Sequence, residues 1–466
     1  MARMEDWLRL AARMAPYGIL GLLYLGALTN WTWNVFGFDR LSLGAGYDSL
    51  ADSLLRGQVL VDPRHIRPEA IFTPRGAVMY FGIFPALLRV IGNFLMPSMW
   101  GRWTALSTAA ACVLAVWGFT RGARIALSAN PDLSARWRAA FLWASFVTLA
   151  LGSPVLHLVA ASNIYFESIA WAFAGTMAAL SFLTGALLSG DFRARTMVGF
   201  GAFACVASLA RPTYGVPLWL VAGLLLWLLV RRPAQERSWR AMLALVMPLV
   251  ATFLVLGWYN AARWGSPFVF VDLTGYVQRE SYEFVLAQGQ WNPHRIATGF
   301  FNYFTVSPRH FLSAPPYVRL ILPVYLNPTY FSEFRQGFLS IPVSAPWLLP
   351  TAIGGIVLTM HRGPRQPALL AAVSLLATQI VLICGFYHIA HRYSLEIYPT
   401  LVFAYFYFLA FVPASRLTRA VALEIVLLVF LSVAINALSQ INWLVYTNGQ
   451  TSAVVREALH KTFPGR

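Results

Sequence analysis

Long apolar runs divide the sequence, and this feature limits what the chain can fold into more than any other. The first run covers residues 14–36, and further runs that approach the ~20 residues needed to cross a bilayer begin near residues 101, 138, 163, 196, 212, 240, 340, 367, 394 and 419. Hydrophobic residues make up 58% of the 466 residues and charged residues only 11%. This balance is too apolar for a water-soluble globule. The predicted fold class is therefore all-α, a polytopic transmembrane bundle of about 11–13 membrane segments.

A shorter run at residues 79–97 does not read as an ordinary crossing. It contains Pro85 and Arg89, and an arginine at the centre of a bilayer costs ~2.5–3.5 kcal/mol on insertion scales. We expect this run either to re-enter the membrane or to cross it in a bent form.

Basic loops give the expected orientation, because short arginine-rich loops remain in the cytoplasm. When the apolar runs are counted as successive crossings, loops of this kind all fall on the same side of the membrane. They lie at residues 120–138, 189–196, 230–240, 361–365 and 415–419. With the N-terminus also cytoplasmic, two polar segments are expected outside. The predicted parts of the chain are an N-terminal transmembrane module (1–263) with the external loop 37–78, an external loop region (264–338), and C-terminal transmembrane helices with a short tail (339–466).

The positive charge of the chain is explained by the same loops. Lysine and arginine number 35 against 18 acidic residues, and attraction to anionic lipid accounts for such an excess in a membrane protein. A nucleic-acid partner is therefore not expected. The three cysteines lie far apart within apolar runs, which is typical of small core residues and gives no sign of a disulfide or a zinc site: Cys112, Cys205 and Cys384.

The polar stretch GYDSLADSLLRGQVLVDP at residues 46–63 predicts a helix that lies in the membrane interface. Apolar residues recur at helical spacing on one side, and Asp48, Asp52 and Arg56 fall on the other side, with Gly57 as a C-terminal cap. Such a helix would either shield the bundle or cover a cavity that opens to the outer leaflet.

Six short motifs resemble the GT-C superfamily of polytopic bacterial glycosyltransferases. They are the helix pattern Y-x-x-L-A-x-x-L-L-x-G at residues 47–57, the pattern Y-F-G-x-x-P-A-L-L at 80–88, and the stretches IYFESIAW (164–171), LARPTYG (209–215), YNAARWGSPFVF (259–270) and HRYSLEIYP (391–399). The resemblance implies an inverting transferase in the inner membrane that uses a polyprenyl-phosphate sugar as donor and a cell-envelope glycan or lipid as acceptor. It also implies an acidic general base in the first external loop.

The expected catalytic residues depart from the family pattern. Members of the superfamily often carry an acidic pair a few residues before the tyrosine of the interfacial helix, whereas LSLGAG precedes Tyr47 here. The nearest carboxylates are Asp48 and Asp39, and we take Asp48 as the first candidate and Asp39 as the second. Glu167 is a further acidic candidate at the end of an apolar run. The alternatives are a helix-dipole contact for Asp48 and a solvated loop charge for Asp39.

A lipid-linked donor also needs cationic groups to hold its phosphate. Arg211 and Arg392 lie at the expected outer ends of apolar runs, and Glu396 follows Arg392 at the spacing of a helical ion pair. The full set of predicted substrate-binding residues is Tyr47, Arg75, Arg211, Arg309, Arg392 and Tyr393.

No cofactor is expected, and a divalent metal is left open. His388 and His391 lie three residues apart without a third ligand at useful spacing, so we do not interpret them as a metal site. The expected partners are membrane lipid, a polyprenyl-phosphate-linked sugar, and a glycan or lipid acceptor. The alternative functions are a transporter or flippase of lipid-linked glycans, and a glycan ligase or polymerase.

Overall fold

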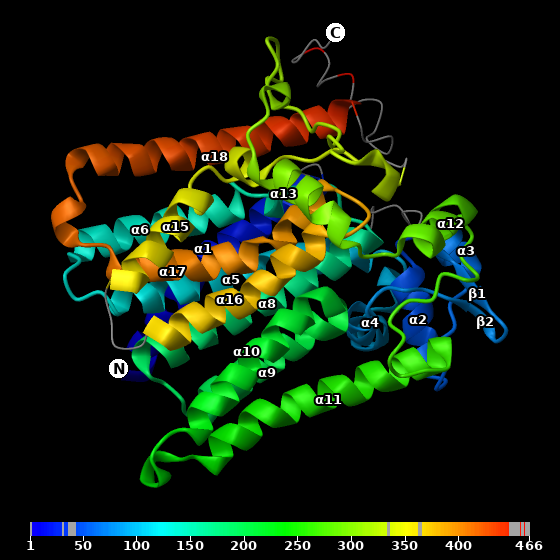
Figure 1. Ribbon diagram of the computed structural model, residues 1–466, viewed down its shortest axis with the longest axis horizontal. Helices are drawn as coiled ribbons and strands as arrows, with labels where there is room; N and C mark the ends of the chain where they lie inside the picture. The colour runs from blue at the N-terminus through cyan, green and yellow to red at the C-terminus, as the bar shows by residue number, and fades with distance from the viewer. Residues whose placement is uncertain are drawn as a thin grey trace.

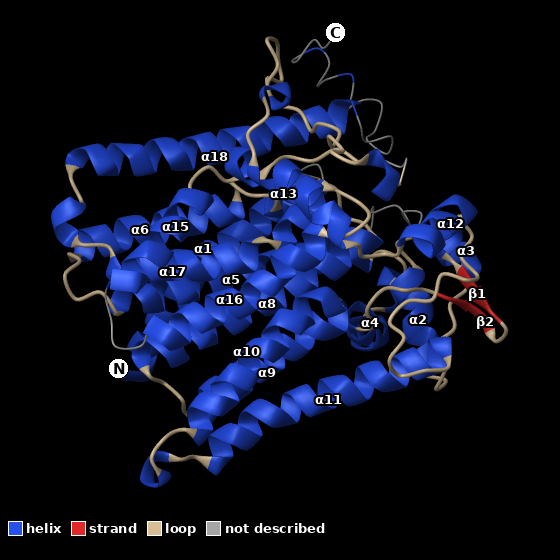
Figure 2. Cartoon of the chain, viewed as in Figure 1, coloured by secondary structure: helices blue, strands red, loops and turns tan. Residues whose placement is uncertain are grey.

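The computed structural model describes residues 2–29, 32–35, 43–332, 336–361 and 366–446, together with Glu457 and Lys461. The described chain is helical almost throughout (Figure 2). Its one small sheet is an antiparallel pair, β1 (Ile71–Thr73) with β2 (Gly76–Val78), and Phe72 faces Ala77 in the register. The predicted all-α fold class is confirmed.

Seven helical stretches of the described chain are long and apolar enough to cross a membrane. They are α5 (Trp103–Ser128), α6 with α7 (Ala135–Ala150 and Val155–Ala160), α8 (Ile164–Ser189), α10 (Pro212–Val230), α11 (Trp239–Trp264), α16 (Gln366–Cys384) and α18 (Arg419–Tyr446). Five shorter apolar helices join them, which are α1 (Ala2–Leu28), α4 (Phe84–Leu95), α9 (Ala194–Ala210), α15 (Leu348–His361) and α17 (Tyr398–Phe411). The remaining helices are α2 (Gly46–Leu54), α3 (Pro63–Ile66), α12 (Arg279–Gln288), α13 (Ile296–Phe304) and α14 (Ile341–Ser344).

The helices begin close to where the apolar runs predict them. The run expected near residue 163 is α8, which starts at Ile164, and the run expected near 240 is α11, which starts at Trp239. The run near 340 is divided instead, because α14 ends at Ser344 and α15 begins only at Leu348. In the described chain seven stretches are long enough to cross a membrane and five apolar helices are shorter, so the expected number of about 11–13 membrane segments stays a prediction.

The bundle has two distinct ends (Figure 1). The loops before α11 and before α18 lie at the left of the view, whereas α2, α3, β1, β2 and α12 lie at the right. Contacts join the basic loops to one another, since the Asn130 side chain donates to the carbonyls of Leu409 and Val412, and the Arg232 guanidinium lies 4.2 Å from the Phe192 ring centre. Four of the five basic loops therefore lie at one end of the molecule, and residues 362–365 of the fifth lie outside the described residues. Which side of a membrane that end faces stays a prediction.

Helix α8 forms the centre of the bundle. In its most apolar window 83% of the residues are buried, compared with 17% for α18. Small residues allow its neighbours to approach closely: a Cβ added at Gly118 of α5 would meet the Ala178 backbone nitrogen at 2.5 Å, and one added at Gly175 would meet the Ala207 nitrogen of α9 at 2.7 Å. Helices α11 and α18 lie at the periphery and leave much apolar surface exposed.

The structure corrects the exposure expected for α2. Asp48, Ser49 and Ser53 are buried, although the sequence assigns them to a polar face turned to water. The reason is a neighbour that spacing within one helix does not reveal, because α4 packs against α2 and brings Arg89 to Asp48. Helix α4 has 12 residues, about 18 Å of rise, which is too short to cross a bilayer as a straight helix.

Candidate active site

A buried ion cluster holds two of the three predicted catalytic carboxylates. Arg89 donates from Nη2 to Glu167 Oε1 at 2.5 Å, and its Nε lies 3.6 Å from Asp48 Oδ2. The three side chains are 2%, 0% and 0% exposed. Burial raises the pKa of the Asp48 carboxyl to about 6, although the Arg89 charge acts in the opposite direction. The cluster links α2, α4 and α8. Asp39, the remaining candidate, lies outside the described residues.

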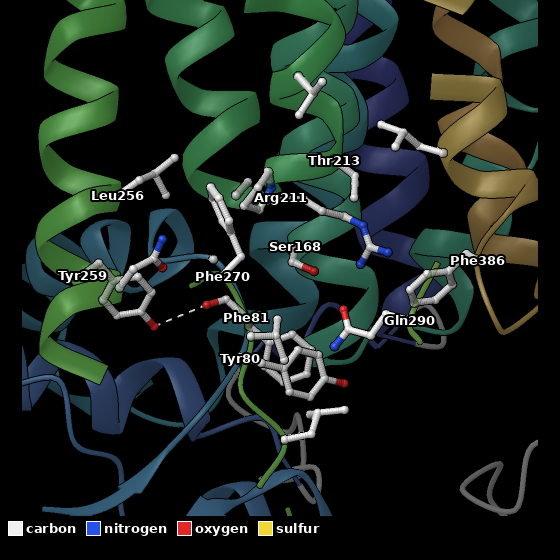
Figure 3. Close-up of a pocket in the computed structure, with 18 of the residues that line it drawn as sticks. Tyr80, Phe81, Ser168, Arg211, Thr213, Leu256, Tyr259, Phe270, Gln290 and Phe386 are labelled. Atoms are coloured by element: carbon white, nitrogen blue, oxygen red, sulfur yellow. Dashed lines mark hydrogen bonds between the residues drawn. The ribbon is translucent and has the colours of Figure 1, made fainter. Parts of the chain in front are cut away.

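A cavity of about 350 Å³ lies beside this cluster, at the end of the bundle that carries α2 and α12 (Figure 3). Its wall is formed by the segment after β2, the junction of α9 and α10, the C-terminal part of α11, the loop around residue 273 and the segment after α16. Apolar residues Val216, Leu256 and Leu382 line one part of it, and Arg211, with several tyrosines, lines another. This volume falls within the range of ~300–1,000 Å³ for small-molecule sites.

Arg211 is the cation best placed in the cavity. It lies where α9 ends and α10 begins, and its guanidinium is seen between Ser168 and Phe386 in Figure 3. Its Nε is 2.8 Å from Glu396 Oε1, and Thr213 Oγ1 donates to the other oxygen of the same carboxylate at 2.8 Å. Glu396 therefore orients Arg211. The predicted pairing of Glu396 with Arg392 is wrong, because this carboxylate turns to a residue on another helix junction.

Tyr393 lies between two guanidinium groups. The Cζ atoms of Arg211 and Arg392 are 5.0 and 4.7 Å from its ring centre, and Arg392 Nη2 donates to its hydroxyl at 3.3 Å. Burial acts to raise the pKa of the Tyr393 hydroxyl, but the two guanidinium charges together hold it below the ordinary value. This part of the wall is therefore electropositive and can stabilise an anion. Arg392 reaches the cavity through Tyr393 and also bonds Gln336.

Glu69 is the acidic residue that sequence reasoning missed. It is 3% exposed. The Tyr80 and Tyr276 hydroxyls donate to its Oε2 at 2.9 and 2.8 Å, while the Tyr165 hydroxyl and Gln278 Nε2 donate to its Oε1. Tyr80 and Tyr276 also line the cavity, so the carboxylate lies directly behind two hydroxyls of the wall. One sequence signal was available, because Glu69 is the last acidic residue before the Y-F-G-x-x-P motif.

Arg263 shapes the cavity wall and is not a free cation. It is buried, and it donates from Nη1 to the Met79 carbonyl at 2.8 Å and from Nη2 to Asn260 Oδ1 at 2.7 Å. The Tyr259 hydroxyl donates to the Phe81 carbonyl at 3.2 Å, the bond dashed in Figure 3. These bonds fasten the segment around Phe81 to α11. The backbone of the cavity is thereby held in place.

The other predicted substrate-binding residues are not among those that line the cavity. Tyr47 is fully buried with its ring centre 6.3 Å from that of Phe81. Arg75 is exposed and reaches only the Ala262 carbonyl. Arg309 is exposed in the loop after α13, where its carbonyl accepts from Arg319. The structure thus brings together Arg211, Arg392 and Tyr393 and leaves the other three apart.

Buried histidines occur near the cavity without forming a metal centre. The rings of His157 and His391 lie 4.9 Å apart, and His391 Nδ1 accepts from the Leu339 amide. Within the described ranges, no group of three or more histidine, cysteine, aspartate or glutamate side chains is arranged to hold a metal ion.

The fold and the site together define a polytopic α-helical membrane protein with a cationic and aromatic cavity at one end of its helices. No family model and no curated protein matches the sequence. Solved structures of an archaeal oligosaccharyltransferase from Archaeoglobus fulgidus are similar in their helical arrangement. The apo form is 14% identical with a TM-score of 0.46, over 97% of this chain and 60% of that chain.

Two further oligosaccharyltransferase structures from Archaeoglobus fulgidus have similar identity and coverage. The complex of AglB with an inhibitory peptide and a dolichol-phosphate is 15% identical with a TM-score of 0.46, over 97% of this chain and 60% of that chain. The complex with Zn and sulfate is 15% identical with a TM-score of 0.48, over 95% and 57%. The present chain therefore spans about 60% of the length of these structures. The likeness is loose, and the function proposed below rests on the cavity of this chain.

Proposed function

We propose that the protein is a membrane glycosyltransferase of the GT-C type, which transfers a sugar from a polyprenyl-phosphate donor to a cell-envelope glycan or lipid. The observation that carries this proposal is the convergence of Arg211, Tyr393 and the tyrosines bound to Glu69 on one cavity with an apolar side. A phosphate, a sugar and a lipid chain each find a matching wall there.

The donor phosphate would bind at the electropositive wall. The guanidinium of Arg211 is oriented by Glu396, and a guanidinium presents planar donors that suit a phosphate. As the bond between the anomeric carbon and the phosphate oxygen breaks, charge grows on the phosphate, and fixed donors stabilise that charge. The first isoprene units would lie against Val216, Leu256 and Leu382.

The acceptor proton would leave through the tyrosines to Glu69. A tyrosine that donates to a carboxylate can still accept through its oxygen, so Tyr80 and Tyr276 can each take a hydrogen bond from an acceptor hydroxyl. When that hydroxyl oxygen attacks the anomeric carbon, its proton passes to the tyrosine oxygen and the tyrosine proton passes to Glu69. The phosphate departs with the electrons of the broken bond. Attack from the face opposite the phosphate inverts the anomeric configuration.

We prefer Glu69 to the carboxylates chosen from the sequence. Asp48 and Glu167 are paired with Arg89 and do not line the cavity, whereas Glu69 is one hydrogen bond from it. The proposed scheme calls for no cofactor. We further propose that the protein resides in a bacterial inner membrane with its N-terminus in the cytoplasm and the cavity toward the external face.

The test uses purified protein reconstituted in lipid with a radiolabelled polyprenyl-phosphate sugar. We expect transfer of label to a glycan or lipid acceptor, and no transfer from a soluble nucleotide sugar in the absence of the lipid carrier. The variant Arg211→Gln with Glu396→Gln removes the cation while keeping the pair neutral, and should lower transfer by about 100-fold or more. Arg75→Gln removes an exposed arginine at the same end and serves as the control.

Two results would contradict the proposal. Transfer directly from the nucleotide sugar would show that the donor is not lipid-linked. Movement of the intact lipid-linked sugar across the bilayer without hydrolysis or transfer would identify a carrier instead of an enzyme.

A further inference from the structure

A second large hollow lies between α6 and α18, on the side of the bundle away from the cavity. It has a volume of about 1000 Å³ and shares no lining residue with the cavity. In Figure 1, α18 runs along the top of the molecule and α6 lies below its left part. We refer to this hollow as the α6/α18 groove.

The floor and sides of the groove are apolar. Helix α18 contributes Ala422, Val426, Val429 and Val433, which recur at helical spacing over about 16 Å of rise. Helix α6 contributes small residues at matching depth, including Ala140 and Ala144. Trp137, Trp143 and Val147 of α6 complete the apolar lining opposite the α18 stripe.

The open side of the groove faces outward. Trp143 of α6 is 57% exposed, and Val426 and Phe430 of α18 are 62% and 71% exposed. Large apolar side chains at this exposure are expected to meet lipid in a protein that spans a membrane.

One end of the groove is positively charged. Arg136 and Arg419 line it there, and both are exposed. Both helices also begin at this end, α6 at Ala135 and α18 at Arg419, so their dipoles place partial positive charge beside the two guanidiniums. No carboxylate lines the groove in the part of the chain that the structure describes. Glu424 of α18 lies two residues from both Ala422 and Val426, on the opposite side of the helix.

We propose that the α6/α18 groove is a binding site for one acidic glycerophospholipid. Its phosphate-containing headgroup contacts Arg136 and Arg419, and one acyl chain lies along the apolar channel. The charge at the mouth selects an anionic headgroup over a zwitterionic one. The basic loops at this end belong to the expected cytoplasmic side, so the lipid comes from the leaflet opposite the cavity and is not the donor.

Such a lipid would fasten α18 to the bundle. Only 17% of the apolar window of α18 is buried within the protein, so this helix gains much of its packing from what occupies the groove. A ligand that binds the folded state alone raises its stability. The bound lipid is therefore expected to raise the unfolding temperature of the whole protein.

The experiment measures lipid binding to the delipidated full-length protein in detergent by native mass spectrometry, with phosphatidylglycerol and phosphatidylcholine of identical acyl chains. We expect one phosphatidylglycerol to be retained with at least about 10-fold preference and to raise the unfolding temperature. The variant Arg136→Gln with Arg419→Gln should abolish that preference. The matched control is Arg195→Gln with Arg240→Gln, which removes two exposed arginines from the second positions of α9 and α11.

A second variant keeps the charges and fills the groove. Ala422→Trp should reduce retention of phosphatidylglycerol without changing the net charge. Equal binding of the two phospholipids, or an equal loss in the control, would show ordinary annular lipid and overturn the proposal. Displacement of phosphatidylglycerol by a polyprenyl phosphate at equal concentration would identify the donor lipid as the occupant and overturn it as well.

Discussion

Arg211 and Glu396 meet across the cavity end of the bundle, with 2.8 Å between Nε and Oε1, although 185 positions separate them in the sequence. Glu396 is almost fully buried and Arg211 is 20% exposed at its side chain. The carboxylate therefore anchors the arginine from behind and leaves the rest of the guanidinium near the cavity. Under the proposed function, the shape of the cation and not only its charge would therefore determine donor binding.

Replacing Arg211 with lysine tests that point. The variant Arg211→Lys keeps a positive charge beside Glu396, so folding should be preserved, but it loses the planar set of donors. We expect kcat/KM for the lipid-linked donor to fall by about 10-fold or more. Steady-state kinetics alongside Arg75→Lys, at an exposed position outside the cavity, gives the comparison. Equal kcat/KM values for the two variants would show that Arg211 does not bind the donor.

The proposed base is tested by Glu69→Gln. Glutamine keeps an acceptor oxygen for the surrounding tyrosines but cannot take up a proton, so turnover should fall by about 10²–10⁴ while donor binding persists. The control is Asp62→Asn in the same segment between α2 and β1, where the aspartate pairs with the exposed Arg64. Initial rates and donor affinity are measured for both. Similar rates for the two variants would contradict the role of Glu69.

Asp48→Asn separates a structural carboxylate from a catalytic one. Because burial raises the pKa of Asp48 from 3.8 to about 6, the folded state binds more protons than the unfolded state between these values. Stability from this group is therefore greatest below the lower value and is lost as the pH rises through the upper one. Asparagine mimics the neutral form, so the variant should lose this part of the pH dependence while its turnover changes by no more than a few-fold.

Unfolding temperatures between about pH 4 and pH 7 measure this effect. Asp52→Asn, one turn along α2, is the control, because its carboxylate accepts from the Trp100 indole and does not contact Arg89. A 100-fold loss of turnover in Asp48→Asn alone would identify Asp48 as the general base, as the sequence predicts.

Reporter fusions test the orientation. Reporters that are active only outside the cytoplasm should be active at residues 60 and 300 and inactive at residues 130 and 235, because the basic loops are expected to remain inside. Activity at residue 235 would reverse the orientation and place the cavity on the side of the nucleotide sugars.

The helices could be predicted from the sequence because the signal for each is local. The run that forms α8 is apolar from end to end, so the limits of the helix can be predicted from that run alone. The exposure of Asp48 could not be predicted in this way, since a polar side of a helix faces water only if no other helix covers it. Arg89 of α4 covers Asp48 here. Considered within its own apolar run, that arginine indicates only a cost to membrane insertion.

Part of the lining of the candidate site could also be predicted from local signals, while its function stays a prediction. Arg211 and Tyr393 stand out because charged and aromatic residues are conspicuous at the ends of apolar runs. Glu69 does not stand out, since its environment is made by Tyr80, Tyr165 and Tyr276, which come from three separate segments. A carboxylate takes its chemistry from its partners, and these partners meet only in the folded chain.

The contacts of the loop after α11 also determine how a substrate can reach the cavity. The Phe72 amide donates to the Gly275 carbonyl at 2.9 Å, and the Val277 amide donates to the Ala70 carbonyl at 3.2 Å. These two hydrogen bonds join the segment around Phe72 to the loop after α11 on both sides of Tyr276, whose hydroxyl donates to Glu69. Opening this loop would break both backbone hydrogen bonds. Val216 of α10 and Leu256 of α11 line the apolar part of the cavity, so under the proposed function we expect a lipid-linked donor to enter from the side of these two helices.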